Sequence, residues 1–229
     1  MDDGFVWKGM HSASYGLICE SLPNISVPER RVEKVELNSR NGYYTIDHQT
    51  YSGDVKSVSF HLTNEKNIDV VKSWLSGSGK VTFSSQPDRY YKAVIISKVD
   101  LEQVIPTLHK GLVQFDCQPF GYLHDGKIPL ILTQSVSTVI NTGNYPSEPY
   151  IKLICDGDIV LRVNGTPLSI KDVSGYVEID ADLDKIYKGT ESMENKASGD
   201  TPIFETGVNT IEWTGNITRV EITPRWRCL

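Results

Sequence analysis

The sequence lacks any long apolar run. None of its 229 residues lie in a segment apolar and long enough to cross a bilayer, and the acidic opening MDDGFVWKGM has no apolar core of the kind a signal peptide needs. We therefore expect no membrane partner, and synthesis in the cytosol. With 39% hydrophobic and 23% charged residues the composition is that of a folded protein, which excludes disorder over most of the length.

Cysteine is scarce and scattered. The four thiols, Cys19, Cys117, Cys155 and Cys228, lie far apart in the sequence and form no CxxC pair. This spacing suggests neither a disulfide framework nor a zinc knuckle. The sequence predicts buried, unreactive thiols.

Positive charge is also in short supply. Lys and Arg number 23 against 29 Asp and Glu, for a formal net charge of −6. The richest basic segments are PERR at 28–31 and PRWR at 224–227, and neither is long enough to form a patch. Because nucleic-acid binding draws most of its free energy from clustered Lys and Arg, we expect no specific binding of DNA or RNA.

Local catalytic and cofactor motifs are missing from the sequence as well. There is no GxSxG elbow, and SGSGK at 76–80 lacks the spacing of a phosphate-binding loop. Asp180, Asp182 and Asp184 have the spacing of calcium-loop ligands, but Lys185 stands where the sharp turn needs glycine, so we interpret them as turn residues. We predict no catalytic residue, no cofactor and no metal site. A pair of carboxylates that meet only in space, as in a cell-wall hydrolase, stays open.

What the sequence does have is alternation of apolar and polar residues. In 55–62, Val58, Phe60 and Leu62 share one face of an extended chain, while serines and a histidine share the other. This period of two is typical of half-buried antiparallel strands and predicts a mainly β, nearly all-β, chain. It recurs in the segments 32–37, 55–62, 112–117, 150–155, 159–164, 176–180, 210–213 and 219–223.

One segment, 63–77, has helical spacing instead. Thr63 or Asn64 is the candidate N-cap and Gly77 the stop signal. The apolar residues between them are Ile68, Val71, Trp74 and Leu75. They predict one short amphipathic helix packed on a sheet.

The connector GYLHDGKIPL at 121–130 predicts a domain boundary, because Gly, Pro and polar residues gather there between two groups of strands. We expect an N-terminal domain over 1–125 and a β-sandwich over 131–229, in which strands are separated by turn signals such as CDGD and WTGN. The segment 185–202 has little apolar content and predicts an exposed loop.

Two adjacent tyrosines follow a turn signal in QPDRYYKAVI at 86–95. We predict a turn at Pro87 and Asp88, and then a strand in which Tyr90 and Tyr91 point to opposite faces. One tyrosine is expected in the core and the other at a contact with a neighbouring subunit.

The aromatic residues of the C-terminal half leave an alternative open. Trp213 and Trp226, together with tyrosines 145, 150, 176 and 187, could form a platform on which a sugar stacks. Alternating strand positions favour core packing for most of them.

Longer segments stand in a distinctive order. The N-terminal half contains FVWKGMHSASYGLICESL, VPERRVEKVELNSRNGYY, WLSGSGKVTFSSQPDRYYKAVI and VQFDCQPFGY. The C-terminal half contains NTGNYPSEPYIKLICDGDI, VEIDADLDKIY and GDTPIFETGVNTIEWTGNITRVEITPRWR. In this order they resemble the distal tail protein family of long non-contractile-tailed phages (siphophages) and prophages. One departure is Asn38-Ser39, where relatives more often carry a glycine.

The resemblance implies a structural virion protein at the tail tip. Its N-terminal domains would form a ring, a hexamer, around the DNA channel, and its galectin-like or carbohydrate-module-like C-terminal domains would project outward. It implies contacts with the tail tube protein, the tail-associated hub or lysin protein, and receptor-binding or baseplate proteins. DNA would pass without specific binding, and −6 per copy agrees with a channel that repels it. The resemblance carries over no catalytic residue.

Four residues are candidates for contacts between subunits: Arg30, Arg40, Tyr90 and Tyr91. The alternative function is a carbohydrate-binding module acting in host adsorption, with Trp213 and Trp226 against the sugar.

Overall fold

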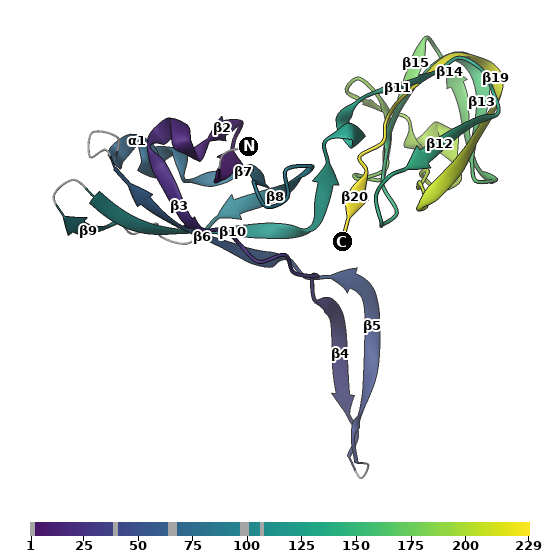
Figure 1. The fold of residues 1–229 in the computed structure, drawn as a ribbon. Coiled ribbons are helices and arrows are strands. Elements are labelled where there is room, and N and C mark those ends of the chain that lie inside the picture. Colours follow the sequence, from purple (N-terminus) through teal and green to yellow (C-terminus); the bar gives the residue numbers. More distant parts are fainter. Residues whose placement is uncertain (1–2, 39–40, 64–67, 97–100, 106–107) are drawn as a thin grey trace. The chain divides into compact units, whose positions relative to one another are not determined.

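The computed structural model describes residues 3–38, 41–63, 68–96, 101–105 and 108–229, and it is mainly β, as the alternation predicts (Figure 1). The chain divides into two compact units. Unit 1 comprises residues 1–121 with Leu229, and unit 2 comprises residues 122–228. The division falls within the predicted connector 121–130, near the end of a long strand, β10 (Leu108–Leu123), which is followed by a short 3₁₀ turn, η3 (Asp125–Lys127).

Unit 1 is built on a sheet with the strand order β2-β1-β7-β8-β10-β6-β3, and β9 also pairs with β10. The predicted alternation in 55–62 is confirmed: Val58, Phe60 and Leu62 are fully buried on one face. The elements are β1 (Phe5–Trp7), β2 (Met10–His11), η1 (Ser12–Tyr15), β3 (Leu17–Ser21), β6 (Asp54–Leu62), β7 (Gly77–Phe83), β8 (Arg89–Ile95), β9 (Leu101–Ile105) and β10.

The predicted helix is α1 (Ile68–Trp74), which buries Val71, Trp74 and the following Leu75. Two reciprocal hydrogen bonds attach it to β1: the indole of Trp7 donates to the carbonyl of Trp74 (2.9 Å), and that of Trp74 donates to the carbonyl of Trp7 (3.2 Å). The candidate N-cap Asn64 lies outside the described residues. Gly77, with φ +68°, opens β7 and lies three residues beyond the end of α1.

A separate two-stranded antiparallel sheet is formed by β4 (Arg30–Glu36) and β5 (Tyr43–Tyr51) (Figure 1). We call this hairpin the arm. The prediction of a strand at 32–37 is confirmed, but the prediction that it is half-buried is wrong, because almost every residue of both strands is exposed.

Unit 2 is one curled sheet organised by two long paired strands, β13 (Tyr150–Val163) and β19 (Gly207–Thr223). Near Tyr150 this pair is extended by β15, β16 and β17 on one side and by β11 on the other. Near Val163 it is extended by β14 and β18 on one side and by β12 on the other. The remaining elements are β11 (Leu130–Leu132), β12 (Ser137–Asn141), β14 (Thr166–Val173), β15 (Tyr176–Asp180), β16 (Lys185–Lys188), β17 (Glu191–Ser192), η4 (Glu194–Lys196), β18 (Ala197–Ser198) and β20 (Arg227–Cys228).

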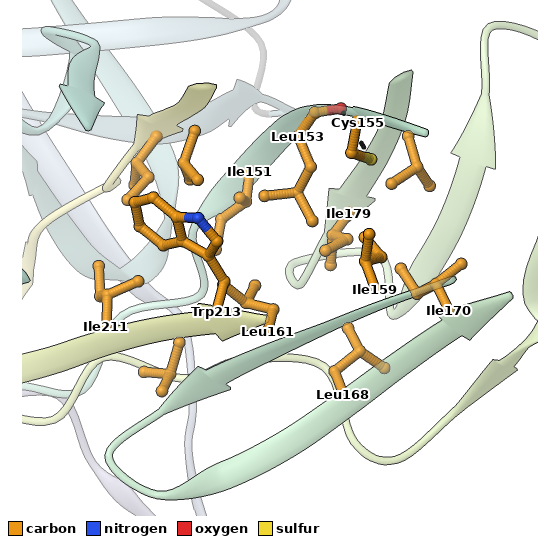
Figure 2. Packing of buried hydrophobic residues seen from close by; sticks show 14 of the residues in the cluster. Ile151, Leu153, Cys155, Ile159, Leu161, Leu168, Ile170, Ile179, Ile211 and Trp213 are labelled. Carbon is orange, nitrogen blue, oxygen red and sulfur yellow. Dashed lines mark hydrogen bonds between the residues drawn. The ribbon is translucent and has the colours of Figure 1, made fainter. Parts of the chain in front are cut away.

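The two halves of this sheet fold over one shared core, which gives unit 2 the two layers of a sandwich (Figure 2). Ile151 and Leu153 come from the first half of β13, whereas Leu161 comes from the second half, and all belong to the same buried cluster. Trp213 of β19 lies in this cluster as well.

The bend in the long pair occurs where the sequence predicts turns. CDGD and WTGN do not end strands; they form bulges within β13 and β19, where the register shifts between Asp156 and Val160. Gly157 (φ +79°) and Gly215 (φ +98°) adopt left-handed conformations that favour glycine. A Cβ atom on Gly215 would come within 2.5 Å of the Asp158 carbonyl oxygen. Glycine therefore lets the strands bend and continue.

The prediction that 185–202 forms a loop is wrong, although many of its residues are exposed, as expected. The segment contains β16, β17, η4 and β18. Two apolar residues, Ile186 and Met193, are buried in the core of unit 2, and the Met193 amide donates to the Ile186 carbonyl (2.8 Å). These two buried side chains and the pairing of β16, β17 and β18 order a segment whose composition is otherwise polar.

Candidate interaction surfaces

The arm has one apolar face. Residues directly opposite each other in an antiparallel pair share a face, and the register places Val35 opposite Tyr44 and Glu33 opposite Ile46. Leu37, two residues beyond Val35, continues this row. Tyr44, Ile46 and Leu37 are 52%, 47% and 43% exposed, although they are the residues that a core would bury. We call Val35, Leu37, Tyr44 and Ile46 the apolar face.

The opposite side of the arm is more polar. Its cross-strand pairs are Glu36 with Tyr43, Lys34 with Thr45, and Val32 with Asp47. The Lys34 ammonium lies 4.8 Å from the centre of the Tyr43 ring, so part of this side is covered by its own side chains. A shallow hollow of about 120 Å³ lies at the tip, lined by Leu37, Asn41, Gly42, Tyr43 and Tyr44.

Neither outer edge of the arm pairs with another strand in the part of the chain that the structure describes. A lone two-stranded hairpin is marginally stable in water, and free strand edges are templates for pairing with another chain. An exposed row of large apolar side chains likewise marks interaction surfaces. The arm therefore has the physical features of a segment that is completed by a partner.

Of the four predicted contact residues, Arg30 lies on the arm and is exposed. Its guanidinium binds Asp47 with both Nε (2.9 Å to Oδ1) and an NH2 group (2.7 Å to Oδ2). This hydrogen bond is the main cause that lowers the pKa of the Asp47 carboxyl. Arg40 lies outside the described residues.

Neither of the two adjacent tyrosines is exposed in a single copy of the chain, and a contact of either with another subunit stays a prediction. The turn at Pro87 and Asp88 and the strand after it are present, but Tyr90 and Tyr91 are each only 7% exposed. Tyr91 lies in the unit 1 core with Lys56 Nζ 4.9 Å from its ring centre. On the other face, Lys80 Nζ lies 4.8 Å from the centre of the Tyr90 ring. Both faces of β8 are covered at this point.

The sugar-stacking platform is not formed by the two predicted tryptophans. Trp213 (8% exposed) and Trp226 (4%) both belong to the core of unit 2, where Trp226 packs 5.6 Å from Phe204 between ring centres. The nearby tyrosines are half-buried, and a cation covers a face of at least three of them. The pairs are Arg227 over Tyr145 (5.4 Å), Arg225 over Tyr150 (5.9 Å) and Lys152 over Tyr176 (4.4 Å).

The first of the three carboxylates with calcium-loop spacing, Asp180, is engaged in an ion pair. Asp180 is buried and accepts two hydrogen bonds from Arg225 (2.6 and 2.9 Å), which lower the pKa of its carboxyl. Arg227 binds Glu148 in the same two-bonded way (2.7 and 2.8 Å). These contacts hold the segment before the C-terminus on β15 and on the chain just before β13.

The prediction of unreactive thiols agrees with the structure. All four cysteines are free; three are buried and Cys19 is half-buried. Burial raises the pKa of Cys117 to about 12 and that of Cys155 to about 11, which keeps these thiols protonated at neutral pH. Among the described residues, no helix has the length and apolarity needed to span a bilayer.

Comparison with known proteins gives a likeness in structure and none in sequence. No protein-family model matches the chain, and no curated protein matches it. Among solved structures, the chain is similar to the crystal structure of the SPP1 Dit (gp 19.1) protein, described as a paradigm of the hub adsorption apparatus in phages that infect Gram-positive bacteria. The TM-score is 0.75 at 15% identity, over 96% of this chain and 97% of that chain. The resemblance predicted from the sequence is confirmed at the level of the fold.

Proposed function

We propose that the chain is a structural protein of a phage tail that assembles into a ring at the distal end of a long non-contractile tail. The likeness in fold supports this role because it extends over nearly the whole of both chains, including both units. The observation that carries the assembly is the apolar face of the arm, where Leu37, Tyr44 and Ile46 are 43%, 52% and 47% exposed.

The occupant that we propose for the apolar face is a second copy of the same chain. A contact in which the arm of each copy binds a different surface of the next is head-to-tail, and such contacts generate closed rings when the rotation between copies closes. Each copy would then both donate an arm and receive one. Closure would cover every arm, which removes both the free edges and the exposed apolar residues.

We further propose six copies in the ring, with the tail tube protein on one side and the tail-associated hub protein on the other. Unit 2 would dock receptor-binding or baseplate proteins. DNA would pass through the ring without specific binding, which agrees with the net charge of −6 per copy. The role needs no catalysis.

The test uses two neighbouring substitutions on opposite sides of the arm. Ile46→Lys places a charge in the apolar face opposite Glu33, and Thr45→Glu places one on the polar side opposite Lys34. Each new charge meets an opposite charge across the pair, so neither should disturb the arm itself.

Native mass spectrometry and negative-stain images of the full chain are the measurement. We expect rings for the unmodified chain and for Thr45→Glu, and single copies for Ile46→Lys. Single copies for the unmodified chain at every concentration, or rings that survive Ile46→Lys, would refute assembly through this face.

A further inference from the structure

The arm is joined to unit 1 through an irregular segment of β5. Arg30 on β4 pairs with Tyr51 on β5, and Val32 pairs with Asp47. The chain between the two pairs is therefore longer on β5 than on β4, so β5 carries extra residues there. Gln49, within them, has φ +55°, a left-handed conformation that is uncommon for residues other than glycine. Bulges of this kind bend a strand pair and set the direction in which it continues.

One carboxylate holds this bulge together. Asp47 Oδ1 accepts a hydrogen bond from the Gln49 amide (2.8 Å), which is the amide of the left-handed residue. The same carboxylate binds the Arg30 guanidinium through both of its oxygens. The planar guanidinium matches a carboxylate in only a narrow range of geometries, so the two strands are fixed relative to each other at this point. We call Arg30, Asp47 and Gln49 the root contact.

The root contact continues into the sheet of unit 1. The Arg30 guanidinium lies 5.9 Å from the centre of the Tyr51 ring, and Tyr51 meets Phe120 of β10 edge to face, with ring centres 6.3 Å apart. The chain on either side of the arm is tied together as well, because the Ser52 amide donates to the Glu29 carbonyl (2.8 Å). A series of contacts thus leads from the bulge to β10.

We propose that Asp47 is a positioning residue that makes the root of the arm rigid, so that the apolar face is presented in one direction before assembly. An exposed ion pair contributes little to the stability of a fold, and the role of Asp47 is not stabilisation of unit 1. Its role is to restrict the arm to one orientation relative to the sheet of unit 1. The arm then loses less conformational entropy when a partner binds it. The consequence for ring assembly rests on the function proposed above, whereas the rigid root itself does not.

The test compares Asp47→Ala with Glu36→Ala, which removes a carboxylate from the same side of the arm but away from the bulge. Nitroxide amino acids are introduced at Thr45 of the arm and Leu112 of β10, both exposed, and the four cysteines are left in place. Pulsed electron paramagnetic resonance then gives the distribution of distances between arm and sheet in single copies of the full chain.

We expect a narrow distribution for the unmodified arm and for Glu36→Ala, and one at least about twofold wider for Asp47→Ala, with an unchanged thermal midpoint. Ring assembly should weaken by about tenfold or more in Asp47→Ala. Equally narrow distributions in all three chains, or a distribution already wide in the unmodified chain, would overturn the proposal. A narrow distribution that widens in Asp47→Ala, in a chain that never forms rings, would instead leave the rigid root standing and refute the ring.

Discussion

The arm and the β13–β19 pair are both long antiparallel strand pairs with alternating apolar residues, yet only one of them is covered. In unit 2 the apolar residues of the long pair, such as Ile151 and Val220, are fully buried because the sheet folds back over them. In the arm, Tyr44 and Ile46 lie on one face of the strand pair and are about half exposed. Both pairs place apolar residues on one face, and what differs is how far the described parts of the chain bury that face.

This difference shows that alternation with a period of two predicts which face of a strand is apolar, but not what covers that face. For β13 and β19 the partner is another part of the same chain. For the arm, the partner that we propose is another copy of the chain. The two regions should then respond in opposite ways to substitution, with stability affected in unit 2 and assembly affected in the arm.

The largest loss of stability is expected in the core of unit 2. Leu161→Ala removes a side chain that is almost fully buried and leaves a cavity, so the free energy of unfolding should fall by about 2–5 kcal/mol. Urea denaturation followed by a spectroscopic signal from unit 2 checks this value. A loss below about 1 kcal/mol would mean that the layers are not packed as described.

The next largest loss of stability is expected at the bulges, which let the sheet of unit 2 fold over its core. Gly215→Ala forces a Cβ atom against the Asp158 carbonyl oxygen and also strains a left-handed backbone, so we expect a loss of about 2–3 kcal/mol. Gly157→Ala is the matched control, since its Cβ would meet open space and only the backbone strain remains, about 1–2 kcal/mol. Equal losses measured by thermal unfolding would argue against a close approach at Gly215.

A smaller, pH-dependent effect is expected from Asp180. Arg225 lowers the pKa of this carboxyl in the folded chain, so the pair stabilises the fold above the unfolded pKa of about 3.9. That contribution, about 1–2 kcal/mol because Arg225 is partly exposed, is lost as the pH falls through the lower folded value. Denaturation curves of the unmodified chain and Asp180→Asn should differ at pH 7 and converge at acidic pH. A difference that persists unchanged below pH 3 would exclude the ionised pair as its cause.

The smallest effect on stability is expected in the arm. Ile46→Ala should change the free energy of unfolding of single copies by no more than about 0.5 kcal/mol, because its side chain is already half in water. Denaturation at concentrations too low for assembly tests this directly. A loss comparable to that of Leu161→Ala would show that the arm is packed within its own chain after all.

The parts of the fold that could be predicted from the sequence are strands whose own alternation of apolar and polar residues separates a buried face from an exposed one. Val58, Phe60 and Leu62 identify β6 because one face is buried and the other is not. The continuity of β13 and β19 could not be predicted, since CDGD and WTGN have the composition of turns. They form bulges because β13 and β19 pair with each other across Gly157 and Gly215, which a single segment of sequence does not show.

The candidate site was harder to predict for the same reason. The segment 43–51 forms β5, but tyrosines and threonines occur on both of its sides, so its alternation is weak and does not predict the apolar face. Tyr90 is buried because β8 is covered on both faces, which a single strand pattern does not reveal. Arg30 could be singled out from the sequence, but its relation to Asp47, seventeen residues away, depends on the hairpin register.

The most direct test of the central claim is hydrogen exchange measured on single copies and on the assembled protein. If another copy covers the arm, the amides of Tyr43–Tyr51 should exchange about tenfold or more slowly after assembly, while those of Tyr150–Val163 stay unchanged. Arm amides that exchange equally fast in both states would contradict the claim that another copy covers the arm.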